Sequence, residues 1–168
     1  VLEAIGSTLE HTLGSVDNFL VGMVSFARYT NATWPFVTVP DYAVRLAKLR
    51  SLSKAVLVSQ YHFVAGDERT EWEAYSVAND GWVAEAIEVQ KTAENFKGKI
   101  VTNFSTRGDI HASAGNPDPY DAPGPYLPQW QHAPVIPIHA PHNWHATTFP
   151  GLQQSIDAVM VTRKISLS

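Results

Sequence analysis

The sequence predicts an α+β fold in which one long N-terminal helix precedes a domain of short helices and few strands. Apolar residues in the first thirty positions recur at steps of three and four, which is typical of an amphipathic helix. Residues 54–64 are rich in β-branched and aromatic side chains, as expected of a strand. Beyond Gly115 the composition changes, because nine of the eleven prolines lie between Pro117 and Pro150. Such a density of proline predicts irregular backbone.

The composition limits the chemistry of the chain. Its 168 residues fit one domain, and the absence of Cys excludes disulfides, thiolate metal sites and Cys nucleophiles. A net charge of −4 argues against nucleic acid as a partner. The longest apolar stretch, residues 19–27, is shorter than the roughly 20 residues of a membrane span. The chain begins with Val1 and stops directly after an apolar run, so we expect it to be a fragment.

The predicted helix over residues 1–30 carries its apolar residues on one face. Two interpretations are open: the face packs on its own domain, or the helix is a stalk whose face meets a second copy of the chain. Periodicity alone favours the first. The residues of this face are Leu2, Ile5, Leu9, Leu13, Val16, Leu20, Met23 and Ala27.

The elements that follow are short. Two prolines, Pro35 and Pro40, predict an extended connector, and Asp41 can cap a helix over residues 42–51. The strand over residues 54–64 ends at a Gly-Asp turn, where Asp67 is the expected N-cap of a helix that runs to Ser76. Further elements are a helix over 82–95, a strand over 100–104, a long irregular segment over 114–150 and a last helix over 152–162.

Three histidines form the densest group of possible metal ligands. His139, His142 and His145 are spaced three residues apart, and zinc accepts imidazole ligands. However, Pro141 breaks any helix that would align them, and no Asp or Glu lies within the run. Loop histidines packed against Trp144 and the prolines explain the run more simply, so we favour no metal and no cofactor and keep a metal site as the alternative.

Two Asn residues stand in glycosylation sequons. Asn31 and Asn103 are each followed two residues later by Thr or Ser, with no Pro between. They favour an extracytoplasmic location, although such triplets also arise by chance.

Several blocks of the sequence resemble a known family. The stretch Glu68-Arg69-Thr70-Glu71-Trp72-Glu73 resembles the E-R-x-x-[aromatic]-E signature of CHASE-type sensor domains, which are PAS-like modules outside the membrane. Other blocks are similar to the ectodomains of receptor-type adenylate/guanylate cyclases of diatoms and other algae. These are residues 34–41, 72–76 and 124–131, with Pro134-Val135 and Asn143-Trp144 after them, and the resemblance covers about residues 20–165.

The resemblance implies a receptor in which this chain is not catalytic. It implies a stalk helix over 1–30, the N-terminal part of a PAS-like sensor domain over 31–113, the proline-rich segment over 114–150, and a helix with the start of a truncated remainder over 151–168. Arg69, Trp72 and Glu73 would serve ligand sensing or the structural frame of the sensor. The partners would be an unknown small molecule or peptide, a second copy through the stalk, and a membrane through flanking helices absent here.

The sequence leaves three functions open. The first is the extracellular sensing segment of a plasma-membrane receptor cyclase. The second is a histidine-rich metal-binding protein or metal-dependent enzyme that uses His139, His142 and His145. The third is a sensor of the same fold that regulates a histidine kinase, and nothing within these 168 residues identifies the output domain.

Overall fold

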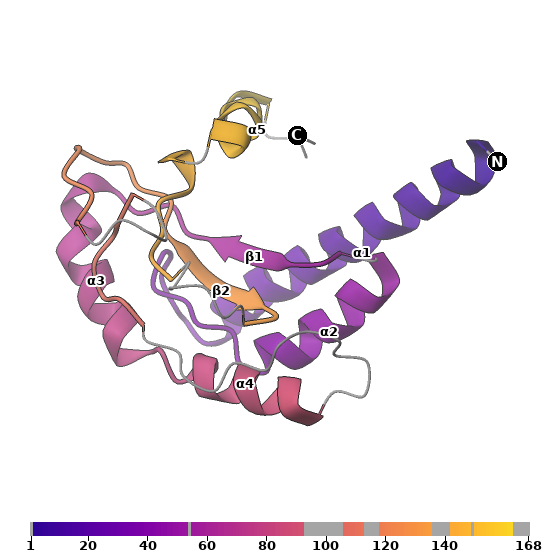
Figure 1. Cartoon of the computed structure of the whole chain (residues 1–168), viewed down its shortest axis with the longest axis horizontal. Helices are drawn as coiled ribbons and strands as arrows, with labels where there is room; N and C mark the ends of the chain where they lie inside the picture. The colour runs from indigo at the N-terminus through magenta and orange to yellow at the C-terminus, as the bar shows by residue number, and fades with distance from the viewer. Residues whose placement is uncertain are drawn as a thin grey trace.

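The structure is a computed structural model that describes residues 2–53, 55–92, 106–112, 118–135, 142–148 and 150–162. Over these residues it combines α-helices with one small antiparallel sheet, which confirms the α+β class (Figure 1). The strand predicted over 100–104 lies outside the described residues.

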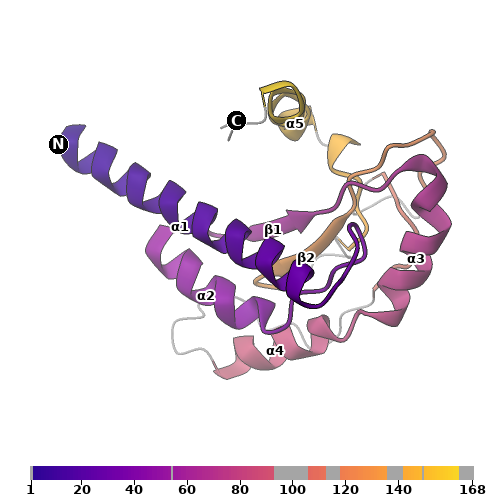
Figure 2. The ribbon, with the colours of Figure 1, turned by 180° about the vertical axis from the view of Figure 1, so that it is seen from behind.

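Helix α1 spans Leu2–Tyr29, as its periodicity predicts, and its N-terminal half extends away from the rest of the molecule (Figures 1 and 2). The C-terminal half lies beside α2, Tyr42–Ser53. Met23 and Ala27 are buried there, so this half packs on its own domain. No helix in the described ranges has the length and apolar character needed to cross a membrane.

The sheet has two strands in the described part of the chain, β1 (Val58–Tyr61) and β2 (Gln129–Ala133). They pair antiparallel, with Val58 opposite Ala133, Ser59 opposite His132 and a register shift before Tyr61. Strand β1 is shorter than the predicted run. The prediction that 114–150 is irregular throughout is wrong, because β2 lies in it and all five of its residues are buried.

A side-chain amide explains why a Gln-rich run forms a buried strand. The Gln131 amide accepts a hydrogen bond from Val39 N at 2.8 Å and donates one to Val39 O at 2.9 Å. It therefore replaces the backbone partner that a neighbouring strand would supply, and the Gln131 amide and the Val39 backbone satisfy each other. Helix α2 packs against both β2 and α4.

Helix α3, Arg69–Ala78, follows a 3₁₀ turn, η1, over Gly66–Glu68. The N-cap of α3 is Glu68 and not Asp67, which lies inside the turn, and Glu68 Oε2 accepts a hydrogen bond from Ala65 N at 3.0 Å. Helix α4, Trp82–Thr92, comes next and confirms the second predicted helix up to residue 92. The 3₁₀ turn η2, Ala146–Thr148, leads to α5, Pro150–Thr162.

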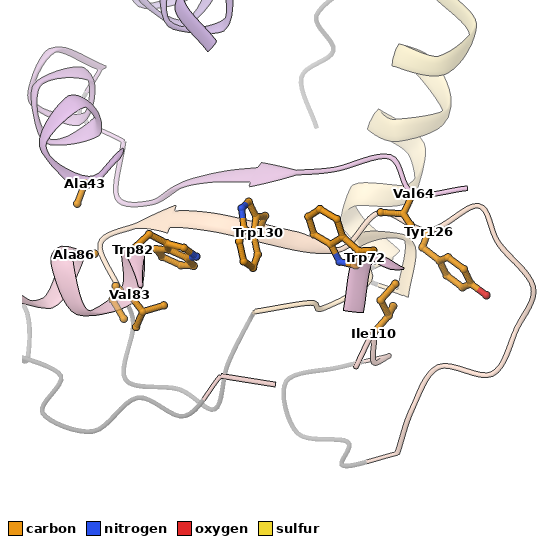
Figure 3. Packing of buried hydrophobic residues seen from close by; sticks show 10 residues of the cluster. Ala43, Val64, Trp72, Trp82, Val83, Ala86, Ile110, Tyr126 and Trp130 are labelled. Atoms are coloured by element: carbon orange, nitrogen blue, oxygen red, sulfur yellow. The ribbon is translucent and has the colours of Figure 1, made fainter. Parts of the chain in front are cut away.

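Buried side chains form two separate clusters. The aromatic core joins α3, α4 and β2 and contains Trp72, Trp82 and Trp130 (Figure 3). The stalk-side core joins α1, the connector and α2, with Ala133 of β2. Its buried members are Met23, Ala27, Val37, Val39, Tyr42, Leu46, Leu49 and Ala133.

Candidate functional site

The three signature residues lie in the first two turns of α3. Arg69, Trp72 and Glu73 are spaced i, i+3 and i+4, so their side chains leave the helix on one side. This side of α3 faces segments that are distant in sequence, 106–112, 118–126 and 142–145. The sequence therefore places the signature at the point where several loops meet the helix.

Arg69 joins α3 to the proline-rich segment. Its Nε donates to Glu73 Oε1 at 2.8 Å, and its Nη1 donates to the carbonyl of Tyr120 at 2.5 Å. The guanidinium also lies over the Tyr126 ring, with Cζ 5.1 Å from the ring centre. The planar head of arginine can satisfy several acceptors at once, so one side chain positions two loop segments.

Glu73 has two donors on the same oxygen. Besides Arg69, the backbone N of Ile110 donates to Glu73 Oε1 at 3.0 Å. About a quarter of each side chain in the Arg69–Glu73 pair remains accessible, at 21% and 27%. The pair is thus partly screened by solvent, and its main effect is to fix segment 106–112 against α3.

Trp72 is fully buried, at 0% exposure. Its Nε1 donates to Asn143 Oδ1 at 2.9 Å, and its ring lies 5.0 Å from His62 and 5.4 Å from Trp130, centre to centre. A ligand in solution cannot reach this side chain without opening the core. These contacts favour the structural-frame interpretation of the signature over direct sensing.

Asn143 organises the same region and was not singled out as a site residue. Its Nδ2 lies 2.8 Å from Ser76 Oγ and 2.9 Å from the carbonyls of Arg107 and Gly108. Its φ of 62° lies in the left-handed region that Asn tolerates better than most residues. The neighbouring aromatic block in the sequence was its only signal, because a single Asn in a loop has no periodicity.

Histidines fill much of the remaining interior. In two of them a backbone carbonyl binds one ring nitrogen: His62 Nδ1 lies 2.5 Å from Pro35 O, and His142 Nδ1 lies 2.8 Å from Arg107 O. A carbonyl can only accept, so Nδ1 carries the proton in both rings and Nε2 carries the lone pair. The buried histidines among the described residues are His62, His111, His132, His142 and His145.

Burial keeps three of these imidazoles neutral. Desolvation lowers the pKa of His62 and of His142 to about 4, in each case against a backbone carbonyl that raises it. Desolvation also lowers the pKa of His132 to about 3, with a smaller effect of His142 in the same direction. Neutral imidazoles with aromatic neighbours are suited to packing.

The histidine run predicted as a possible metal site is only partly described. His139 lies outside the described residues. His145 accepts from Leu127 N through Nδ1 at 3.0 Å, and its Nε2 lies 2.8 Å from Thr147 Oγ1. Both of its nitrogens are therefore already used. Within the ranges that the structure describes, no three His, Cys, Asp or Glu side chains are grouped as a metal ion requires.

One of the two sequons can be placed. Asn31 is exposed in the turn after α1, with a φ of 54°. This position is accessible to a glycosylating enzyme. Asn103 lies outside the described residues.

No family model, curated protein or solved structure matches the chain.

Proposed function

We propose that this chain is an extracytoplasmic sensing segment of a membrane receptor nucleotide cyclase, and that it is itself non-catalytic. The observation that carries the proposal is the shape of α1, whose C-terminal half is anchored in the domain while its N-terminal half extends beyond it (Figure 2). A helix in this position can transmit a change in the domain to whatever precedes it in the chain.

The contacts of the signature support a non-catalytic role. Arg69 and Glu73 bind each other and the loop backbone, and Trp72 is buried and hydrogen bonded. A general acid or base needs to reach the reacting group, and a buried indole bonded to Asn143 does not. The signature therefore serves the frame that holds the sensor together.

The projecting half of α1 is the proposed dimer contact. Leu9 and Leu13 continue the apolar stripe beyond the part that packs on the domain. Two copies that pair along this stripe would form the stalk. Ligand binding would then favour one packing of the stalks over another, and the cyclase domains would respond to that shift in population.

The PAS-like architecture belongs to the proposal as well. A PAS-like sheet needs more strands than the β1–β2 pair of the described ranges, so further strands would come from elsewhere in the chain or beyond it. The cyclase output rests on the resemblance of residues 34–41 and 124–131. A histidine kinase output is compatible with the same stalk. The metal-protein alternative stays a prediction, and no contact of His142 or His145 favours it.

The transcript sequence on both sides of this segment tests the proposal. We expect apolar spans of about 20 residues to bracket a longer ectodomain, followed by a cyclase catalytic domain. A kinase domain in that place would transfer the proposal to the kinase alternative. A start Met directly before Val1 together with a stop codon directly after Ser168 would overturn it.

A further inference from the structure

A cavity lies between the anchored half of α1 and the start of α2, the two helices that run side by side in Figure 2. Its volume is about 380 Å³, and the α1 residues in its wall run from Asn18 to Phe26. At a rise of about 1.5 Å per residue, this wall is about 12 Å long. The cavity is therefore elongated, and it suits an alkyl chain of about eight carbon atoms better than a compact ring.

The wall of this cavity is mainly apolar. Phe19, Met23 and Phe26 of α1 and Val44 of α2 all contribute to it. Gly22 lines the same wall, and a Cβ added there would meet nothing within 4 Å, so the middle of the wall is open. Val44 is 53% exposed, which shows that the cavity opens to solvent. A hydrocarbon chain that enters it would exchange water for apolar contacts.

Two cations of α2, Arg45 and Lys48, line the cavity as well. Both are exposed, and no carboxylate in the described part of the chain forms an ion pair with either of them. The Nε of Arg45 donates to Pro40 O at 3.2 Å, which leaves the terminal N–H groups of the guanidinium for another acceptor. The spacing of i and i+3 places both cations on one side of α2. The lining therefore offers two uncompensated positive charges beside an apolar wall.

These cations belong to a basic stretch of an acidic chain. Five of the twelve Lys and Arg residues lie between Arg28 and Lys54, where Asp41 is the only acid, whereas the whole chain has a net charge of −4. The local field at the cavity therefore favours an anion. A cation with the same hydrocarbon part would be repelled.

We propose that this cavity binds a small hydrophobic carboxylate, with its alkyl chain between α1 and α2 and its carboxylate beside Arg45 and Lys48. The apolar wall provides affinity in proportion to the length of chain that it buries, and the two cations select the charge of the head group. This inference rests on the proposed sensing function, for which it supplies the ligand site and the ligand class.

The position of the cavity couples such a ligand to the stalk. Phe19 and Met23 of α1 also line a second cavity, of about 260 Å³, on the other flank of the helix, where β1 forms part of the wall. Space on both flanks lets α1 shift sideways without breaking a packed core. An alkyl chain that fills one flank would move the helix toward the other.

Binding of octanoate to the 168-residue chain tests the proposal. Isothermal titration calorimetry should give one site with a Kd on the order of 1 mM, which suits a ligand of this size. Octylammonium has the same chain with the opposite charge, and acetate has the same head group without the chain. Both should bind at least about tenfold more weakly. Equal affinity of octanoate and octylammonium, or no saturable binding of octanoate, would overturn the proposal.

A matched pair of glycine variants locates the site. Gly22 lines the cavity and Gly14 does not, although both lie in α1 and a Cβ at either position meets nothing within 4 Å. Leu favours a helix more than Gly does, so circular dichroism should show both variants folded. Gly22→Leu should reduce octanoate binding at least about tenfold by filling the cavity, while Gly14→Leu should leave it unchanged. Undiminished binding to Gly22→Leu would contradict the proposed site.

A second pair of variants tests the charges. Lys48→Gln removes a cation from the lining, and Arg28→Gln removes an exposed cation of α1 that is not part of it. Lys48→Gln should weaken octanoate binding about threefold and make it less sensitive to salt, because the remaining attraction comes from Arg45 alone. Arg28→Gln should change neither property. Equal octanoate affinities of these two variants would remove the contact with α2 and sink the proposal.

Failure of this inference is distinguishable from failure of the proposed function. A receptor gene around this segment with no octanoate binding would leave the sensing function standing and remove the ligand class. Specific octanoate binding in a chain with no receptor around it would remove the receptor function and leave the cavity as a binding site. If a second copy of the chain fills the cavity instead, sedimentation should show a dimer that Gly22→Leu disrupts and Gly14→Leu does not, and the proposal would be wrong.

Discussion

The aromatic core and the stalk-side core are built on different principles. In the aromatic core, Trp72 donates a hydrogen bond at 2.9 Å, and the ring centre of Trp130 lies 5.4 Å from that of Trp72 and 5.9 Å from that of Trp82. Figure 3 shows the three indoles next to one another. The stalk-side core is mainly aliphatic, and cavities lie on both flanks of α1. The aromatic core therefore holds its elements in fixed positions, whereas the cavities beside the stalk-side core leave space into which α1 can shift.

The largest expected effect is that of acid, which should destabilise the aromatic core and its buried histidines. His62, His132 and His142 are neutral in the folded protein, with pKa values of about 4, 3 and 4, and would titrate near 6.5 when unfolded. The unfolded chain therefore binds more protons between pH 6.5 and 4, and stability falls as the pH falls through that window. We expect a loss of several kcal/mol, enough to unfold a small domain, measured by urea unfolding at a series of pH values.

Three variants make the acid prediction specific. His132→Phe removes one imidazole from the core and should lower the midpoint of acid unfolding and reduce its steepness by about one proton. His11→Gln, on the exposed part of α1, should change neither. Asp80 and His111 act on His142 from neighbouring segments, and Asp80→Asn should raise the acid sensitivity slightly. Equal acid sensitivity of His132→Phe and the unmodified protein would contradict the role of the core.

Truncating a buried side chain should cost more unfolding free energy in the aromatic core than in the stalk-side core. Trp130→Ala removes a fully buried indole from a tightly packed cluster and should cost roughly 3–5 kcal/mol of unfolding free energy. Met23→Ala leaves space beside cavities that already exist, where α1 can move in, and should cost about 2 kcal/mol. Chemical denaturation measures both losses of unfolding free energy. The control is Tyr29→Ala: since Tyr29 is 91% exposed, this substitution should change the unfolding free energy by less than about 0.5 kcal/mol.

The Arg69–Glu73 pair should have a smaller effect. Glu73→Gln keeps an acceptor for Ile110 N but removes the charge that Arg69 binds, so we expect a loss of about 1–2 kcal/mol. Glu71→Gln on the exposed side of the same helix should lose less than about 0.5 kcal/mol. If the two variants are equally stable by thermal denaturation, the pair contributes nothing to the frame.

The smallest effect on folding and the clearest effect on assembly should come from the stalk. The double variant Leu9→Glu/Leu13→Glu places charge in the projecting apolar stripe and should weaken dimerisation at least about tenfold without changing the melting temperature. Sedimentation equilibrium measures the dimer, with Glu10→Gln as the control. A chain that is monomeric before any substitution would contradict the stalk proposal.

The sequence predicted the helices well and the sheet poorly, for identifiable reasons. Helix α1 has an unbroken apolar stripe, and α2 and α4 follow clear start signals. Strand β2 has no apolar alternation, because Gln129 and Gln131 occupy buried positions where Ser59 Oγ and the backbone of Val39 bind their amides. Such pairing is between residues about 70 to 90 positions apart and leaves no local pattern.

The candidate site was predictable only in part. The signature gave Arg69, Trp72 and Glu73, and all three lie on one side of α3. Their partners, such as Asn143 and the carbonyl of Tyr120, depend on how distant loops return to the helix.

Hydrogen exchange of the 168-residue chain, followed by mass spectrometry, tests the contrast between the two regions most directly. Peptides from residues 69–90 should exchange only through global unfolding, while peptides from residues 16–27 of α1 should exchange at least about tenfold faster through local opening. Equal protection of the two regions would contradict a fixed core joined to a movable stalk.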